Sequence, residues 1–294
     1  MNAVETSGLC KVYGSQRALD AVNLQVPGGS VLGLVGPNGA GKTTLLSILA
    51  GLRQPTSGSV TIVADHQSIA TLPDTPQFEP WLTGREVVDL ARALVAPSLP
   101  QARVDEVLQA AGLADDRDRR VGGYSRGMLQ RLGLAATLVG APELLLLDEP
   151  ASALDPAGRR EVLDLIAELR GHATVILSSH ILADVQEVAD RVAILRSGRL
   201  VFEGSLGELL TGKTQPAYQV RVRPPLEPAT VALKSQPWVT DVAQRGLDVL
   251  SVRVSSLDEA ERSLTRVLAG VQARVVSLRP EAPDLEEVFL EVTS

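Results

Sequence analysis

The sequence Gly36-Pro-Asn-Gly-Ala-Gly-Lys-Thr43 constrains the fold of this chain more than any other stretch. It matches the pattern G-x-x-x-x-G-K-[ST] without a gap, follows the apolar run Val31–Val35 and precedes the apolar stretch Leu45–Ala50. A strand that turns through glycines into a helix presents backbone N–H groups to an anion, because the helix N-terminus carries a partial positive charge. The pattern therefore predicts a phosphate-binding loop in an α/β domain.

The chemistry of phosphate binding explains why each of these residue types occurs in the loop. Gly36, Gly39 and Gly41 permit backbone dihedrals that a side chain would obstruct, so the loop can wrap a polyphosphate. We expect Lys42 to bridge the β- and γ-phosphates of a nucleotide and the Thr43 hydroxyl to bind Mg²⁺. A glycine-rich turn without function is the alternative, and the flanking strand and helix argue against it. Further nucleotide contacts are expected from Asn38, Ala40 and Thr44.

A second candidate element is Leu144-Leu-Leu-Leu-Asp-Glu-Pro150, which predicts a buried strand that ends in two carboxylates. We expect Asp148 to hold Mg²⁺, directly or through water, and Glu149 to orient the attacking water and accept its proton. Taken alone, such a sequence is usually the polar start of a loop. The phosphate-binding loop makes the catalytic interpretation the preferred one.

Composition excludes several classes of protein. The formal charge of −7 argues against a protein that coats nucleic acid, which would carry a basic surface. Cys10 is a single cysteine and forms no internal disulfide, which is typical of a reducing cytosol. The most apolar stretch, Leu132–Leu147, contains Pro142 and Glu143 and is shorter than the roughly 20 residues of a membrane span. Residues 1–10 lack the features of a secretory signal. We therefore expect a soluble polypeptide that contacts membranes only through a partner.

The pattern along the chain changes near residue 212. At about 150 residues per domain, the 294 residues predict two domains, or one large domain with an appendage. Up to that point, apolar runs alternate with helical patterns and predict βα units with a mainly parallel sheet. These runs are Val31–Val35, Val60–Val63, Leu144–Leu147, Thr174–Leu177 and Val192–Leu195.

The C-terminal part has a different pattern. Leu210–Pro216 loses periodicity and contains Gly, Thr and Pro, so a linker is predicted, placed at residues 213–216. Tyr218–Val222 and Leu250–Val254 alternate apolar and polar residues, as half-buried strands do. Ser256–Gly270 has the spacing of a helix with an acidic first turn. We predict a βαββαβ arrangement over residues 217–279 and a last helix at Asp284–Val292.

Further motifs occur in the order found in the nucleotide-binding subunits of ATP-binding cassette (ABC) transporters, and residues 5 to about 210 resemble that family. Tyr124-Ser-Arg-Gly-Met128, followed by Leu129-Gln-Arg131, is similar to the family's signature motif. Ser152-Ala-Leu-Asp155 is similar to its D-loop, and Ser178-Ser-His180 to its switch-histidine segment. Tyr13 lies where the family has the aromatic residue that stacks on adenine.

Each of these motifs alone also has an ordinary structural explanation. Tyr13 can be a surface strand residue and His180 a packed or capping histidine. Ser125 can cap the helix that follows it, although a serine at a helix N-terminus is also what a γ-phosphate would contact. Together the motifs are specific, since other phosphate-loop NTPases lack the signature and the switch histidine in combination.

The chain departs from the family pattern at two places. The signature is usually L-S-G-G-Q; here Tyr124, Arg126 and Met128 replace three of the five residues, while Ser125 and Gly127 are retained.

The second departure is at the Q-loop, where the family usually has glutamine. Asp74 occupies that position and Gln77 follows three residues later; the Asp74 carboxylate is still an oxygen ligand suited to Mg²⁺. These variations and Leu82-Thr-Gly-Arg-Glu86 resemble the ABC-2 branch of drug, antibiotic and sodium exporters. ATPases of that branch carry a small C-terminal domain ending much like Leu285-Glu-Glu-Val-Phe289.

The resemblance implies a fold and an activity. The expected cassette, residues 1–212, is an α/β P-loop NTPase with a RecA-like core, an antiparallel β-subdomain and a helical subdomain at about 84–140. Residues 217–294 would form a small α+β, ferredoxin-like domain with a role in packing, dimer stabilisation or regulation. The implied reaction is Mg²⁺-dependent hydrolysis of ATP.

The implied assembly is a head-to-tail dimer of ATP-binding subunits, either a homodimer or a heterodimer, and the intact catalytic residues favour the homodimer. This dimer would be bound to an integral membrane permease at the cytoplasmic face of the cell membrane, without nucleic acid. One site would use one subunit's Lys42, Thr43, Asp74, Asp148, Glu149 and His180 and the other subunit's Ser125, Gly127 and Asp155. The alternatives are a soluble ABC ATPase acting on ribosomes or DNA, and a regulatory module without catalysis.

Overall fold

The computed structural model describes residues 1–213, 216–281, 285 and 289. The chain divides into two compact units, Met1–Leu206 and Gly207–Glu291. Within the described residues, no helix has the length and apolar character needed to cross a bilayer.

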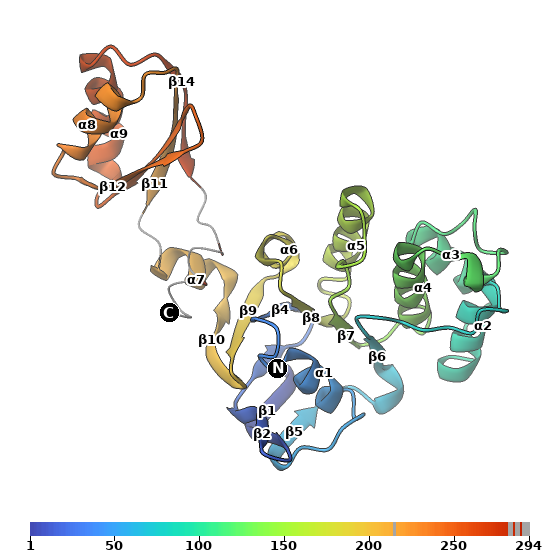
Figure 1. Ribbon diagram of the computed structural model, residues 1–294. Coiled ribbons are helices and arrows are strands. Elements are labelled where there is room, and N and C mark those ends of the chain that lie inside the picture. Colours follow the sequence, from blue (N-terminus) through green and yellow to red (C-terminus); the bar gives the residue numbers. More distant parts are fainter. Residues whose placement is uncertain (214–215, 282–284, 286–288, 290–294) are drawn as a thin grey trace. The chain divides into compact units, whose positions relative to one another are not determined.

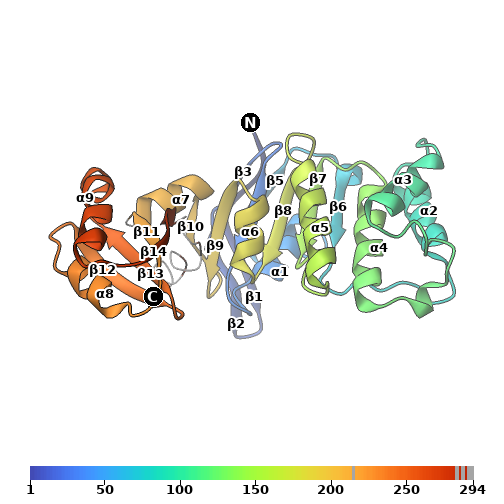
Figure 2. The same ribbon diagram turned by 90° about the horizontal axis from the view of Figure 1, so that it is seen from above.

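A six-stranded sheet forms the centre of the first unit (Figures 1 and 2), with the order β10-β9-β4-β8-β7-β6. Its neighbouring strands run parallel except β10, which is antiparallel to β9. The central strands are almost wholly buried, as expected where helices cover both faces. The predicted mainly parallel sheet is confirmed. Its strands are β4 (Val31–Val35), β6 (Ile69–Leu72), β7 (Leu144–Asp148), β8 (Thr174–Ser179), β9 (Arg191–Arg196) and β10 (Arg199–Ser205).

A second sheet of the first unit is antiparallel and is built around β1 (Asn2–Tyr13). β1 pairs with β2 (Gln16–Val22), β3 (Gln25–Pro27) and β5 (Ser57–Ile62). The expectation that the apolar run Val60–Val63 belongs to the parallel sheet is wrong, because most of it lies in β5. The first three residues of β5 are exposed, and exposed and half-buried residues alternate from Ser59 to Ile62, as in a strand with one solvent-facing side.

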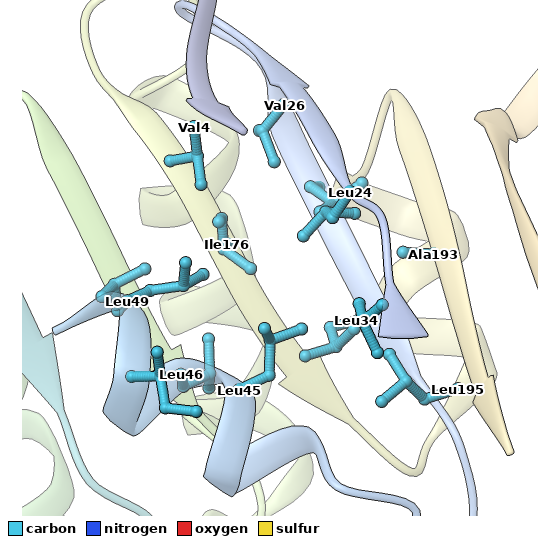
Figure 3. Close-up of a cluster of buried hydrophobic side chains, with 14 of the residues drawn as sticks. Val4, Leu24, Val26, Leu34, Leu45, Leu46, Leu49, Ile176, Ala193 and Leu195 are labelled. Atoms are coloured by element: carbon cyan, nitrogen blue, oxygen red, sulfur yellow. The ribbon is translucent and has the colours of Figure 1, made fainter. Parts of the chain in front are cut away.

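Helices cover both faces of the six-stranded sheet. α1 (Lys42–Leu49) and the antiparallel sheet lie on one face, and α5 (Pro156–Glu168) and α6 (Leu182–Val188) on the other (Figures 1 and 2). The buried core between α1 and the two sheets is built almost entirely from Leu, Val and Ile, as the low aromatic content requires. Figure 3 shows Leu45, Leu46 and Leu49 of α1 pointing into this core, which anchors the helix that follows the phosphate-binding loop.

Three helices form the expected helical subdomain. They are α2 (Gly84–Val95), α3 (Ala102–Ala110) and α4 (Arg126–Leu138). α2 begins with a capping box, in which the Thr83 side chain accepts from the Glu86 N–H and the Glu86 carboxylate accepts from the Thr83 N–H. Short 3₁₀ turns, η1 (His66–Ser68) and η2 (Val121–Gly123), lie in the connecting segments.

The second unit begins within α7 (Leu206–Lys213), which occupies part of the segment expected to lack regular structure. Leu206 and Leu209, three residues apart, lie on one face of α7, and Leu209 is fully buried. The burial of Leu209 offsets the low helix propensity of Gly207 and Gly212. Of the predicted linker, Lys213 ends α7 and residues 214 and 215 lie outside the described residues.

The βαββαβ arrangement predicted for the C-terminal part is confirmed. The four strands form an antiparallel sheet of order β12-β13-β11-β14, which is the ferredoxin-like connectivity. Ser256 caps α9 by accepting from the Glu259 N–H, 3.4 Å away. Most of the predicted helix Asp284–Val292 lies outside the described residues. The elements are β11 (Ala217–Val222), α8 (Glu227–Lys234), β12 (Val239–Arg245), β13 (Val249–Val254), α9 (Leu257–Gly270) and β14 (Val275–Glu281).

Candidate functional site

The predicted phosphate-binding loop connects β4 to α1, as its sequence requires. Gly39 and Gly41 adopt φ values of 80° and 108°, in the region that favours glycine. A Cβ atom at Gly36 would lie 2.4 Å from the Leu195 carbonyl oxygen, and one at Gly41 would lie 2.5 Å from the Ala18 carbonyl oxygen. The glycines are therefore needed both for the turn and for close contact with neighbouring strands.

Lys42, the first residue of α1, folds back over the loop. Its Nζ donates to the Gly36 carbonyl at 2.7 Å and reaches the Pro37 carbonyl at 3.4 Å. The side chain is buried, and burial lowers the pKa of the Lys42 amine, while the nearby Glu149 and Asp148 carboxylates act in the opposite direction. In this position the Lys42 ammonium can donate to a bound phosphate. A phosphate oxygen is a stronger acceptor for it than the loop carbonyls, because both groups of that hydrogen bond are charged.

A cavity of about 340 Å³ opens beside the loop and brings most of the predicted site residues together. Gln16 and Ala18 of β2 also line it, and no motif in the sequence indicates them. Gly36 begins the loop without lining the cavity. The predicted residues that line it are Tyr13, Asn38, Gly39, Ala40, Gly41, Lys42, Thr43, Thr44, Asp74, Asp148 and Glu149.

The two carboxylates lie at the end of β7, beside the end of β8. Asp148 is buried, and its Oδ1 accepts a hydrogen bond from the Ser178 hydroxyl. The Glu149 N–H donates to the Ser178 Oγ at 3.0 Å and to the Ser178 carbonyl at 3.2 Å. The Glu149 Oε2 lies 2.8 Å from the Nδ1 of His180. The predicted group of acidic pair and histidine is therefore assembled, with Ser178 as an additional member.

Two predicted residues lie at the rim of the cavity. Tyr13 is 39% exposed, with the Lys11 ammonium 5.0 Å and the Arg53 guanidinium 5.6 Å from its ring centroid. The ring thus has the exposure that stacking on a base requires, and two cations hold it in place. Asp74 accepts from the Ser152 hydroxyl at 3.2 Å, which links the Q-loop position to the D-loop.

The other predicted residues lie in a second cavity. Ser125, Gly127 and Asp155 line a space of about 600 Å³ that shares no lining residue with the first. Ser125 caps α4 by accepting from the Met128 N–H at 3.2 Å, and Asp155 caps α5 by accepting from the Gly158 N–H at 3.1 Å. The capping role suggested for Ser125 is confirmed, and the positive ends of two helices open into this cavity.

Gln130, which lies two residues after the signature-like segment Tyr124–Met128, is a further functional candidate. It is 2% exposed on α4, and its side-chain amide lies 3.5 Å from the Glu149 carbonyl oxygen. Its contact joins the helix that follows the signature motif to the acidic pair. The signal that identifies it is a glutamine on the buried face of a helix, where polar residues are uncommon.

The donor set of the first cavity fits Mg²⁺. Thr43 supplies a hydroxyl and Asp74 and Asp148 supply carboxylates, and all three line the same space next to the loop. Mg²⁺ prefers oxygen ligands and is commonly held by one or two carboxylates together with the phosphates of a nucleotide.

Comparison with known proteins gives a consistent picture. The family model described as ABC transporter matches residues 19–152. An uncharacterized ABC transporter ATP-binding protein of Bacillus subtilis, YxlF, is 37% identical over 290 residues, covering 97% of each chain. The daunorubicin resistance ATP-binding protein DrrA3 of Streptomyces coeruleorubidus is 38% identical over 307 residues, covering 99% of this chain and 96% of that protein.

A solved structure is also similar. It is the dimeric structure of an ATP-binding cassette in a post-hydrolysis state, bound to ADP and phosphate. It matches with a TM-score of 0.64 and 26% identity over 69% of this chain and 98% of that one.

Proposed function

Because the chain belongs to the family of ATP-binding subunits of ABC transporters, we propose that it uses ATP hydrolysis to drive a separate membrane-spanning permease. Members of this family bind nucleotide and are ATPases, so the chain is an ATPase. The observation that most directly supports this proposal is the first cavity, which is lined by the phosphate-binding loop, the Asp148 and Glu149 carboxylates and other polar residues.

The residues of the first cavity divide the chemistry among them. Thr43, Asp74 and Asp148 would hold Mg²⁺, which neutralises charge on the phosphates when bound. Lys42 binds the β- and γ-phosphates. Glu149 orients the attacking water and takes its proton, and His180 fixes the direction of the Glu149 carboxylate. The overall reaction is ATP + H₂O → ADP + phosphate.

The second cavity supports a head-to-tail dimer. Ser125, Gly127 and Asp155 lie apart from Lys42 in the same chain, so one chain alone presents two incomplete halves. Two copies would join the first cavity of one subunit to the second cavity of the other and enclose two nucleotides. Nucleotide binding then closes the dimer and hydrolysis reopens it.

The permease is the proposed means of membrane contact, at the cytoplasmic face. A cavity of about 350 Å³ lies next to Asp74 in the sequence and is lined mainly by apolar residues, which include Leu72, Pro76 and Phe78. Trp81, which precedes α2, is 63% exposed, and Leu94 of α2 is 75% exposed. Large apolar side chains exposed in this way suit a protein partner. The relative named for daunorubicin resistance supports an exporter.

Co-purification and an ATPase assay test the proposal together. The native chain, isolated from detergent-solubilised membranes, should carry an integral membrane protein and hydrolyse ATP. Glu149→Gln should bind ATP, accumulate as the dimer and lose turnover, because the amide takes no proton from water. Retained turnover in this variant contradicts the role of Glu149. Recovery with ribosomes or DNA instead of a membrane protein favours the alternative ATPase, and absence of hydrolysis favours the regulatory module.

For the C-terminal unit we propose a role in stabilising the dimer. Its buried core, which includes Val220, Leu233, Leu250 and Leu264, lies within the unit itself. A chain ending at Pro216 should bind nucleotide normally but dimerise more weakly with ATP. Normal dimerisation with altered transport would instead assign it a regulatory role.

A further inference from the structure

Ser178 contacts both acidic residues of the candidate site. It lies near the end of β8, is fully buried, and has β7 and β4 as its neighbouring strands. Its hydroxyl donates to the Asp148 Oδ1 and accepts from the Glu149 N–H at 3.0 Å. One hydroxyl supplies one proton, and here that proton goes to the carboxylate expected to face Mg²⁺.

The backbone at Glu149 requires such support. Glu149 has φ = 50°, in the left-handed region that residues other than glycine rarely adopt. A backbone of this kind persists only where its surroundings hold it, and its cost is of order 1–3 kcal/mol. Its N–H meets two acceptors, both from Ser178. The left-handed turn directs the Glu149 side chain toward His180, so Ser178 also affects where the general base lies.

The Asp148 carboxylate is fixed by the same contact. With Oδ1 engaged by Ser178, the rotation of the Asp148 carboxylate is restricted where this residue lines the cavity. Residues that hydrogen-bond to a metal-binding carboxylate set its orientation, and their loss typically costs 10–100-fold in metal affinity or activity.

We propose that Ser178 is a positioning residue, which presents the Asp148 carboxylate to the Mg²⁺ of the nucleotide complex and holds Glu149 in place for water attack. This inference rests on the proposed ATPase site. A residue of β8, the strand that precedes His180, would thus help to arrange both Asp148 and Glu149.

Ser178→Ala tests the proposal, with Thr174→Val as the matched control. Thr174 lies on the same strand, is 4% exposed, and its hydroxyl accepts from the Gly29 N–H at 3.0 Å, outside the site. Each variant therefore removes one buried hydroxyl from β8. A purely structural effect would lower the thermal stability of both and leave the magnesium dependence of nucleotide binding unchanged.

Nucleotide binding is measured with a fluorescent ATP analogue, in EDTA and over a Mg²⁺ titration. For Ser178→Ala we expect binding in EDTA within about twofold of wild type. The Mg²⁺ concentration for half-maximal effect should rise about tenfold, and kcat should fall by roughly 10–100-fold. Thr174→Val should change none of these three quantities.

The proposal is overturned if Ser178→Ala keeps both its Mg²⁺ half-saturation and its kcat within about twofold of wild type. It is also overturned if the control shifts the Mg²⁺ titration equally. The measurement of nucleotide binding over the Mg²⁺ titration does not require ATP hydrolysis. Absence of hydrolysis in the wild-type protein would therefore count against the proposed function, while the Mg²⁺ titration would still decide the role of Ser178.

Discussion

The Nδ1 of His180 lies 2.8 Å from the Oε2 of Glu149, across the ends of the neighbouring strands β8 and β7. The Glu149 side chain is 14% exposed and that of His180 52% exposed, so the pair extends from the cavity wall to the surface. A neutral imidazole that donates from Nδ1 leaves Nε2 as an acceptor for another group. The histidine can thereby orient the base and still contact a ligand.

The first prediction concerns this pair. His180→Ala should lower kcat for ATP hydrolysis by at least roughly tenfold, because the Glu149 carboxylate loses the donor that orients it. ATP affinity in the binding assay should stay close to wild type. His180→Gln should recover part of the activity, since an amide also donates to a carboxylate. Wild-type kcat in His180→Ala would contradict the orienting role.

The second prediction concerns the lysine of the phosphate-binding loop. Lys42→Ala should weaken ATP binding by roughly 10–100-fold, since hydrogen bonds to charged groups contribute about 1.5–3 kcal/mol. Equilibrium binding of a fluorescent ATP analogue measures the effect. Lys234→Ala removes an exposed lysine of α8 in the second unit and should bind ATP normally. Equal affinity in the two variants would exclude Lys42 as a phosphate ligand.

The sequence predicts those parts of the site that depend on short stretches of chain. The loop from Gly36 to Thr43 and the strand end at Asp148 each combine a motif with an apolar strand, and both lie where expected. The separation of Ser125 from Lys42 followed only from the family resemblance, and the structure places them in different cavities.

Long-range contacts explain what the sequence did not predict. β1 pairs with β5 across more than forty residues, from Val4↔Ile62 to Cys10↔Ser57, and an apolar alternation alone does not identify a strand's partner. Gln16 reaches the cavity only because β2 pairs with β1. The role of Ser178 depends on β7 and β8 being neighbours, with Asp148 opposite Ser178, which no local pattern specifies.

The third prediction separates the two roles of Ser125. Asp and Asn cap helices about as well as Ser, so Ser125→Asp and Ser125→Asn should both keep the stability of α4 and of the whole protein. If Ser125 faces the γ-phosphate of a partner's nucleotide, the carboxylate of Ser125→Asp repels it. This variant should lose ATP-dependent dimerisation and turnover, and should still bind ATP in the first cavity.

Size-exclusion chromatography with and without ATP, on Glu149→Gln chains that also carry each Ser125 substitution, measures the difference. Ser125→Asn is the matched neutral control and should retain more of the dimer than Ser125→Asp. Equal dimerisation of the two variants would restrict Ser125 to helix capping and would count against the proposed dimer site.

The fourth prediction concerns the pH dependence of stability and rests on Glu203 of β10. Its Oε1 accepts from the Gln25 N–H at 3.0 Å and thereby connects β10 to β3 of the antiparallel sheet. Burial raises the pKa of the Glu203 carboxyl above its ordinary value, and the Gln25 N–H and Arg191 offset part of this effect. A raised pKa in the folded state means that the folded state binds the proton more tightly than the unfolded chain does. The stabilisation is therefore complete below the ordinary pKa and is lost as pH rises through the folded-state pKa.

Glu203→Gln keeps an oxygen that can accept from the Gln25 N–H, but it does not titrate. The melting temperature of the variant minus that of wild type should therefore be more positive at about pH 7 than at about pH 4. Thermal unfolding at the two pH values measures this difference, and titrations shared by both proteins cancel in it. If the difference for Glu203→Gln is the same at both pH values, the half-buried Glu203 carboxyl has equal pKa values in the folded and unfolded chains, and the prediction is wrong.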